Sequence, residues 1–432
     1  MNIIGKVTIG QLDDLNAWSR EYSGIESGSP NLIGKAIEEF RRFSNDYLNF
    51  FLNLLPIEVR GTPEQSRLWL RALQAFDEYW TPLGEAAAQH LIGPYRTHLD
   101  EGTTIAHDYL KKLDVNLPGV VLYFNKVNAI RFVPYTDVAF LAVPYTHIAR
   151  KDADWMAIPH EIGHYLYWNL ADKLVDVRAR HHEIREIVDS RLRATQKIAE
   201  RPAQEQDAIV NMALNWIEEC FADVVGVKLA DVLFTHSFKI LLSEVSDSAT
   251  NLTEDDGSHP PLCLRPFMRE HVLQKLGLPA TGTDWRKLMQ DAFDIPDFNV
   301  LILRTQPPDV ENLLRAQSLN DLIALLGGME DTVVDKIQPI EWKVNDAIET
   351  IMVMADVLFD ITPNLAESFK SRGGDRSSAF VELRKLAENK AINKEIDPVE
   401  VLLTPIVQEG GLRHSHGGYG HFRYHFVGAH NH

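Results

Sequence analysis

The sequence predicts an α+β fold that is predominantly helical, with one small mixed β-sheet between helical regions. Two observations carry this prediction: helical periodicity runs through most of the chain, and strand-like segments are confined to one short stretch. A third observation is size, since 432 residues with 45% hydrophobic side chains can bury a large core. A chain of this length suggests about two or three folding units.

Residues 1–115 are expected to form an N-terminal helical region. Leu, Ala, Glu and Arg are abundant there and favour helix over strand. Apolar residues recur at helical spacing in three runs, which prolines at positions 56 and 82 interrupt. The predicted helices are Leu32–Leu55, Pro63–Tyr79 and Leu83–Leu91.

The composition changes at residues 117–119, where Leu, Pro and Gly follow one another. Three short segments beyond this point are rich in Val, Phe, Ile and Tyr and are bounded by Asn, Pro and Thr, which is the pattern of β-strands. The predicted strands are Val120–Phe124, Ala129–Val133 and Val138–Val143. They lie in a central region that we expect to span residues 116–280.

The remainder of the central region is expected to be helical. A first helix is predicted over Asp152–Asp172. Residues 173–200 are highly charged, which is typical of an amphipathic insertion with a solvated face. An uninterrupted helix is predicted from Glu205 to Leu233, and helical spacing resumes at Leu264–Leu276 after a polar break.

Residues 281–409 are expected to form a C-terminal helical region, with Leu313–Leu326 and Ile340–Phe359 as examples of helical spacing. Residues 410–432 differ in kind, because they are rich in Gly and His and carry little helical signal. The predicted organisation therefore has four parts: a helical region, the central region, a second helical region and a tail.

Charge and cysteine content limit the classes of function. The net charge is −18, from 61 acidic and 43 basic side chains, so the surface repels nucleic-acid phosphates and a nucleic acid is not an expected partner. Cys220 and Cys263 are the only cysteines, which gives no disulfide framework and fits a reducing compartment.

The sequence carries no recognisable targeting or membrane signal. The N-terminal residues lack a basic stretch followed by an apolar one. No apolar run reaches the roughly 18 residues that are needed to span a bilayer. We therefore expect a cytoplasmic protein without a membrane span, and secretion by a route that needs no N-terminal signal stays open.

The first predicted helix of the central region contains His160-Glu161-Ile162-Gly163-His164. Positions i and i+4 share one face of a helix, so both imidazoles can reach one metal ion, and zinc accepts imidazole nitrogen readily. Glu161 can reach a zinc-bound water without binding the metal, which is the arrangement that a general base requires. The alternative is a helix that happens to carry two histidines. The strand Val138–Val143, directly upstream, is where an edge strand that pairs with a substrate is expected.

A catalytic zinc ion needs a third protein ligand and one position for water. One known continuation of the motif, HExxHxxGxxH, requires Gly at position 167 and His at position 170. Tyr167 and Leu170 occupy these positions, so this version is excluded. The third ligand must therefore come from elsewhere in the chain.

The predicted helix Glu205–Leu233 offers Glu218, Glu219 and Asp223 as candidates. Glu219 and Asp223 are four residues apart and share one face, whereas position 222, four residues after Glu218, is an alanine. We therefore predict that Glu219 binds the metal. Asp223 is predicted to accept the remaining N–H of a metal-binding histidine, His160, and to fix its tautomer.

These residues resemble the gluzincin metallopeptidases, whose signature is HExxH followed by Glu-x-x-x-Asp on a later helix. Ser258-His259-Pro260-Pro261, followed by Arg265, is similar to the His-Pro segment of the CAAX-prenyl-type enzymes. The resemblance covers residues 153–265. It implies a zincin-like catalytic domain with a Zn²⁺ cofactor, in which His259 faces the substrate oxyanion. It departs from that group in having no membrane span and a large charged insertion between the two motifs.

The function expected from these residues is zinc-dependent hydrolysis of peptide bonds in a protein or peptide substrate. Glu161 would act as general base on a zinc-bound water and then deliver the proton to the leaving amine. His259 is the first candidate for the donor that stabilises the oxyanion. Two alternatives stay open: a catalytically latent zinc-binding effector with four protein ligands, and a hydrolase of a non-peptide amide.

Other residues are weaker candidates for the site. Tyr165 flanks the motif and could line a cleft. In the tail, Tyr424 or His425 could reach the cleft on a short strand, or the tail could be flexible with adventitious metal affinity. Cys220 is expected to be a packed thiol, and Trp216 is expected to lie in the core.

Overall fold

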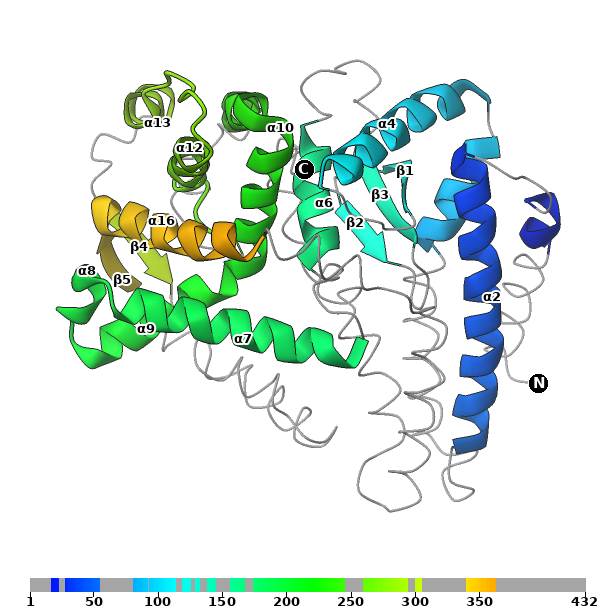
Figure 1. Ribbon diagram of the computed structural model, residues 1–432, viewed down its shortest axis with the longest axis horizontal. Helices are drawn as coiled ribbons and strands as arrows, with labels where there is room; N and C mark the ends of the chain where they lie inside the picture. The colour runs from blue at the N-terminus through cyan, green and yellow to red at the C-terminus, as the bar shows by residue number, and fades with distance from the viewer. Residues whose placement is uncertain are drawn as a thin grey trace, which may run out of the picture. The chain divides into compact units, whose positions relative to one another are not determined.

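The computed structural model describes residues 17–22, 28–54, 81–91, 93–113, 119–125, 129–132, 138–144, 156–167, 174–244, 259–293, 300–304 and 339–362 (Figure 1). Most of these residues are helical, and the rest of the regular structure is one three-stranded and one two-stranded sheet. Described residues up to 180 belong to one compact unit and those from 181 onward to a second. An α+β, predominantly helical architecture is therefore confirmed, whereas the predicted region boundaries at 115/116, 280/281 and 409/410 stay predictions.

The three-stranded sheet consists of β1 (Gly119–Asn125), β2 (Ala129–Phe132) and β3 (Val138–Pro144), which confirms the three predicted strands. The order is β1-β3-β2, with β1 parallel and β2 antiparallel to β3, so the sheet is mixed. The prediction that the last strand forms an edge is wrong, because β3 is central and pairs on both sides. Every residue of β3 is buried, as its continuous apolar run requires.

The outer edge of β1 is covered by the helix at residues 81–91 and by α4 (Gly93–Lys112). Four side chains from these helices take the place of a neighbouring strand: Gln89, His90, Thr103 and His107. Gln89 engages both backbone groups of Phe124, since its Nε2 donates to the carbonyl at 2.8 Å and its Oε1 accepts from the amide at 2.6 Å.

The other three side chains complete this edge. The Leu122 amide donates to Thr103 Oγ1 at 3.1 Å, and the Leu122 carbonyl accepts from His90 Nε2 at 2.8 Å. His107 Nε2 donates to the Val120 carbonyl at 3.2 Å. Burial lowers the pKa of both histidines, so both donate as neutral imidazoles. The edge of β1 is therefore closed to another strand.

Helix α6 (Ala157–Tyr167) follows β3 and lies against β2, β3 and α4 (Figure 1). All of its side chains are buried, which explains why its sequence is apolar on nearly every face apart from the motif residues. The predicted helix Leu32–Leu55 is confirmed by α2 (Gly28–Leu54), and residues 83–91 are helical as predicted.

The charged stretch after α6 forms α7 (Leu174–Arg193) and α8 (Gln196–Ala199), so its predicted helical character is confirmed. Ile184, Val188 and Leu192 are buried on one face of α7, while polar neighbours are exposed. Spacing of four residues places these apolar side chains in one stripe, which is what an amphipathic helix requires.

The predicted uninterrupted helix Glu205–Leu233 is wrong, because two helices occupy this range. Helix α9 (Ala203–Asn215) ends at Trp216, whose amide donates to the Ala213 carbonyl at 3.0 Å, and α10 (Ile217–Glu244) begins directly after it. Trp216 is fully buried and stacks on Trp342, with ring centroids 6.4 Å apart. The break between α9 and α10 thus coincides with a contact between residues far apart in the chain, which local sequence spacing does not indicate.

Helix α10 itself is kinked at Asp231, which has φ 52° and ψ −137°. Beyond this kink, the Phe234 ring lies close to the backbone at Gly226. A Cβ at Gly226 would lie 2.4 Å from Phe234 Cζ, so any larger residue here would force the Phe234 ring to move. Glycine at this position therefore permits the close approach of the two segments.

Among the described residues, the second unit also contains the helices α12 (Arg265–Lys275), α13 (Trp285–Phe293) and α16 (Val344–Ile361). Helices α10, α12 and α16 pack against one another (Figure 1). The predicted helix Leu264–Leu276 is confirmed by α12.

The predicted helix Ile340–Phe359 is correct only in part. Residues Pro339–Lys343 form the strand β5, which pairs antiparallel with β4 (Val300–Arg304), and α16 starts at Val344. Ile and Trp favour strands, and burial of Trp342 stabilises this one.

Several predictions lie outside the described residues, namely the helices Pro63–Tyr79 and Leu313–Leu326 and the whole tail. In the part of the chain that is described, no helix has the length and apolar content to traverse a bilayer.

Candidate metal centre

Helix α6 presents His160 and His164 from adjacent turns of one face. Their Nε2 atoms lie 3.2 Å apart, and their rings are perpendicular, with centroids separated by 4.7 Å. Two nitrogen atoms that bind one tetrahedral zinc ion at about 2.0–2.1 Å are themselves about 3.3 Å apart. The separation of the two imidazoles therefore matches that of two ligands on one ion, and it is also the length of an N–H···N hydrogen bond.

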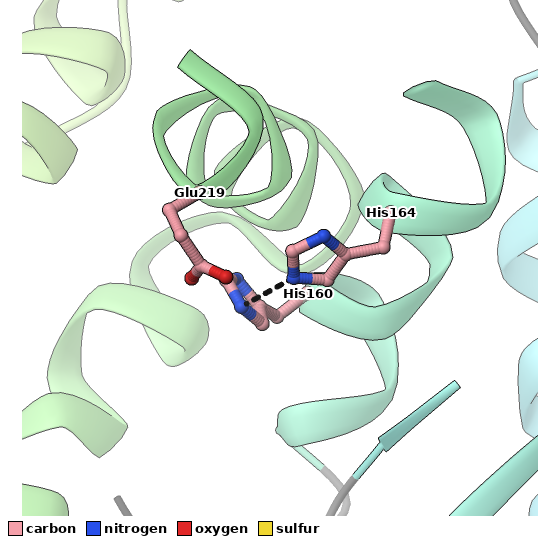
Figure 2. A group of neighbouring side chains, drawn as sticks. All are labelled: His160, His164 and Glu219. Atoms are coloured by element: carbon pink, nitrogen blue, oxygen red, sulfur yellow. Dashed lines mark hydrogen bonds between the residues drawn. The ribbon is translucent and has the colours of Figure 1, made fainter. Parts of the chain in front are cut away.

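Glu219 joins this pair from α10. One ligand atom from each of His160, His164 and Glu219 lies within 4.8 Å of the other two, and all three residues are buried. Figure 2 shows the carboxylate of Glu219 directed toward the imidazoles. The structure thus brings together the three predicted ligands, which we call the candidate metal centre.

The donor set of the candidate metal centre suits a catalytic zinc site. Two imidazoles and one carboxylate are a set that such sites use, whereas magnesium and calcium take oxygen ligands. Within the described residues, the group includes no fourth His, Cys, Asp or Glu ligand. Three ligands leave a coordination position for water or substrate.

The environment of Glu161 is a separate observation on whether the candidate metal centre fits a metal ion. Its side chain is 1% exposed, and both carboxylate oxygens are buried without a hydrogen-bond partner among the described residues. A buried carboxylate in that condition is costly, and a water molecule or ion that accompanies a metal would satisfy it. The position of Glu161 therefore fits a general base beside the centre.

Asp223 is fully buried one helical turn after Glu219 and is held by two arginines of α12. Arg265 donates to it from Nε at 2.7 Å and from Nη2 at 2.8 Å, and Arg269 Nη2 donates at 2.5 Å. The predicted hydrogen bond from His160 to Asp223 stays a prediction.

Burial and the Asp223 carboxylate act in opposite directions on these guanidinium groups. Burial alone would lower the pKa of Arg265, but the carboxylate and its hydrogen bonds raise that pKa above its ordinary value. Burial lowers the pKa of Arg269 to about 10, with Asp223 opposing the change. Both groups therefore stay charged at neutral pH.

Arg269 is absent from the residues predicted for the site. Arg265 and Arg269 are four residues apart on α12, as Glu219 and Asp223 are on α10. Matching spacing of opposite charges on two helices could have indicated the pair, although spacing alone does not show which helices meet.

The two oxygens of Glu219 face different neighbours. Oε1 lies 3.1 Å from His259 Nε2, and Oε2 lies 3.8 Å from Arg265 Nη2. His259 is also buried, and this distance places it next to Glu219, a predicted metal ligand. Its predicted role toward an oxyanion stays a prediction.

The remaining candidates divide into described and undescribed residues. Tyr165 is buried on α6, and its place in a cleft stays a prediction. Cys220 is fully buried, which raises the pKa of its thiol well above the ordinary value and fits a packed thiol. Tyr424 and His425 lie outside the described residues.

The chain was compared with protein-family models, curated proteins and solved structures. No protein-family model, curated protein or solved structure matches this chain.

Proposed function

We propose that this protein is a zinc-dependent peptidase in which His160, His164 and Glu219 hold the metal. The separation of 3.2 Å between the two Nε2 atoms carries this proposal, because it is the spacing of two ligands on one zinc ion. The resemblance of the two motifs to those of gluzincins supports it, and implies a zincin-like catalytic domain.

Zinc bound by these residues would supply a Lewis acid, which polarises a substrate carbonyl and makes water a better nucleophile at neutral pH. Glu161 would take a proton from the attacking water on a carboxylate oxygen and then donate it to the nitrogen of the leaving amine. Its burial and lack of a described hydrogen-bond partner leave the carboxylate available for this transfer.

His259 is the proposed donor to the oxyanion that forms on the substrate. Its Nε2 already lies 3.1 Å from Glu219 Oε1. To act as donor, His259 would have to direct an N–H at the substrate oxygen. The same residue would then influence both the metal ligand and the reacting carbonyl.

A peptide substrate is favoured by the edges of the three-stranded sheet. Side chains close the edge of β1, and β3 is central. Among the described strands, β2 pairs only with β3, and it lies against α6. We propose that an extended peptide pairs with β2 and so brings a backbone carbonyl toward α6.

Metal content and general-base catalysis give separate tests. Protein purified without chelator should contain one zinc ion per chain, and His164→Ala should lose it. Glu161→Gln should retain zinc and lose peptide hydrolysis by on the order of 10²–10⁴-fold, because only the proton transfer is removed. Digestion of a peptide library measures the activity, with Glu349→Gln on the exposed face of α16 as control.

Absence of zinc from the wild-type protein would refute the proposal, as would full activity in Glu161→Gln. Zinc without hydrolysis of any peptide would favour the latent effector. Cleavage of small amides alone would favour the non-peptide hydrolase.

A further inference from the structure

The second unit contains a buried cluster of alternating charges on α10 and α12. Glu219 and Asp223 come from α10, and Arg265 and Arg269 come from α12; all four side chains are buried. Two carboxylates therefore face two guanidinium groups, so the cluster is electrically balanced before any metal binds. Removal of one member would leave a buried charge without its counterion.

The four side chains form a row, with Arg269 at one end and Glu219 at the other. Arg269 touches Asp223, Asp223 touches Arg265, and Arg265 Nη2 lies 3.8 Å from Glu219 Oε2. One row of contacts thus joins Arg269 to a proposed metal ligand.

Two phenylalanines from the part of α10 that follows the kink at Asp231 hold Arg269 in place. Its guanidinium carbon lies 4.1 Å from the centroid of the Phe234 ring and 4.4 Å from that of Phe238. Its Nη1 donates to the Phe234 carbonyl at 3.5 Å. Cation–π contacts and this hydrogen bond fix the plane of the guanidinium group, and with it the direction of the bond to Asp223.

The kink at Asp231 separates the part of α10 that carries Glu219 and Asp223 from the part that carries the two rings. Phe234 nevertheless lies close to Gly226, three residues after Asp223. The same helix therefore supplies Glu219, the carboxylate that pairs with Arg269, and the rings that hold Arg269.

We propose that Arg269 is a positioning residue for the metal-binding carboxylate. By fixing Asp223 it fixes Arg265, and Arg265 in turn restrains Glu219. Arg269 itself contacts neither the metal nor the substrate in this proposal. The inference rests on the proposed function, since it concerns the orientation of a zinc ligand.

Lysine is the informative replacement for Arg269. A lysine keeps the positive charge, but it has one nitrogen in place of the two, Nη1 and Nη2, that reach the Phe234 carbonyl and Asp223, and it has no planar group to pack on the rings. The positive charge must be kept, because a cation near the candidate metal centre repels Zn²⁺. Its loss would by itself strengthen zinc binding and hide the effect of orientation. Arg269→Lys therefore isolates the loss of orientation.

The test uses the full chain, stripped of metal, with zinc affinity measured by competition against a chelator. Arg269→Lys should weaken zinc binding by about 10–100-fold, as expected when a residue that orients a ligand is lost. Arg286→Lys is the matched control. Arg286 of α13 also makes a cation–π contact, with its guanidinium carbon 5.7 Å from the centroid of the Phe267 ring. The zinc affinity of this variant should equal that of the wild type.

A double-mutant cycle tests the route through Asp223. In an Asp223→Asn background, Arg269→Lys should add little further loss, because the contact that carries its effect is already altered. If Arg269→Lys does not fold, Phe238→Leu, which removes one ring from the pocket, should weaken zinc binding by about 2–5-fold.

Zinc affinity unchanged in Arg269→Lys, with a lower melting temperature of the metal-free protein, would show a purely structural role and overturn the inference. Full additivity with Asp223→Asn would overturn the proposed route, as would unchanged affinity in Phe238→Leu. A wild-type protein that binds no zinc refutes the proposed function as well, so the two failures are distinguishable.

Discussion

Asp223 shows how one buried carboxylate can stabilise a fold and prepare a site. It accepts three hydrogen bonds from Arg265 and Arg269, and both arginines lie in the interior. Its neighbour one turn earlier, Glu219, has its carboxylate between His259 and Arg265. We therefore expect the stability of α12 and the orientation of the proposed metal ligand to depend on the same ion pairs.

Replacement of Asp223 by alanine should be strongly destabilising. Two buried guanidinium groups would lose their shared carboxylate, and breaking a buried ion pair costs about 3–5 kcal/mol. Hydrogen exchange of α12 in the metal-free protein measures the loss as a lower free energy of opening.

Asp207→Ala is the matched control, because Asp207 pairs with Arg193 at 2.7 Å on the surface. An exposed pair contributes about 0–1 kcal/mol. A loss in Asp223→Ala no larger than that in Asp207→Ala would contradict this interpretation of the buried cluster.

At the scale of elements, β1 shows how a strand can end a sheet without a free edge. Gln89 holds both the amide and the carbonyl of Phe124. Thr103 and His90 hold both groups of Leu122, and His107 holds the carbonyl of Val120. The helices beside β1 thus satisfy buried backbone groups that would otherwise attract another strand.

Gln89→Ala should show how far the protection of β1 depends on this side chain. Loss of the amide leaves the N–H and C=O of Phe124 without their partners, at a cost of about 1–3 kcal/mol. The expected result is faster hydrogen exchange of peptides that cover Gly119–Asn125. Gln196→Ala on exposed α8 is the control, and equal protection in the two variants would show that Gln89 does not cap the strand.

At the scale of the whole molecule, one lysine couples stability to pH. Lys228 of α10 donates to the Phe359 carbonyl at 2.9 Å and to Thr362 Oγ1 at the end of α16. Burial lowers the pKa of Lys228 to about 8, while Asp360 raises it and Lys275 lowers it further.

The sign of the effect follows from proton counting. An unfolded lysine keeps its proton to a pKa near 10.4, so between about pH 8 and pH 10.4 the unfolded state binds more protons than the folded state. The contribution of Lys228 to stability therefore rises with pH in this window and is constant below it.

Lys228→Met should remove this slope. Relative to the variant, the wild-type protein should gain thermal stability as the pH is raised from 8 to 10, and differential scanning calorimetry measures the gain. Lys287→Met, on an exposed position of α13, is the control. Parallel pH profiles for the wild type and Lys228→Met would contradict the expected linkage.

Local patterns determined much of the secondary structure and part of the site. Residues 120–143 carry three strand signals that the structure confirms, and Ile184, Val188 and Leu192 form the apolar stripe that the charged insertion needed. The i, i+4 spacing of His160 and His164 is enough to place both imidazoles on one face. These features depend on neighbours within a few residues, so the sequence by itself determined them.

Tertiary contacts decided what local spacing leaves open. Strand pairing shows that β3 is central, and the packing of Trp216 on Trp342 accompanies the break between α9 and α10. The approach of Glu219 to the two histidines, and the pairing of Asp223 with Arg269, likewise join residues far apart in the chain. No periodicity encodes such distances, because they depend on which buried surfaces fit together.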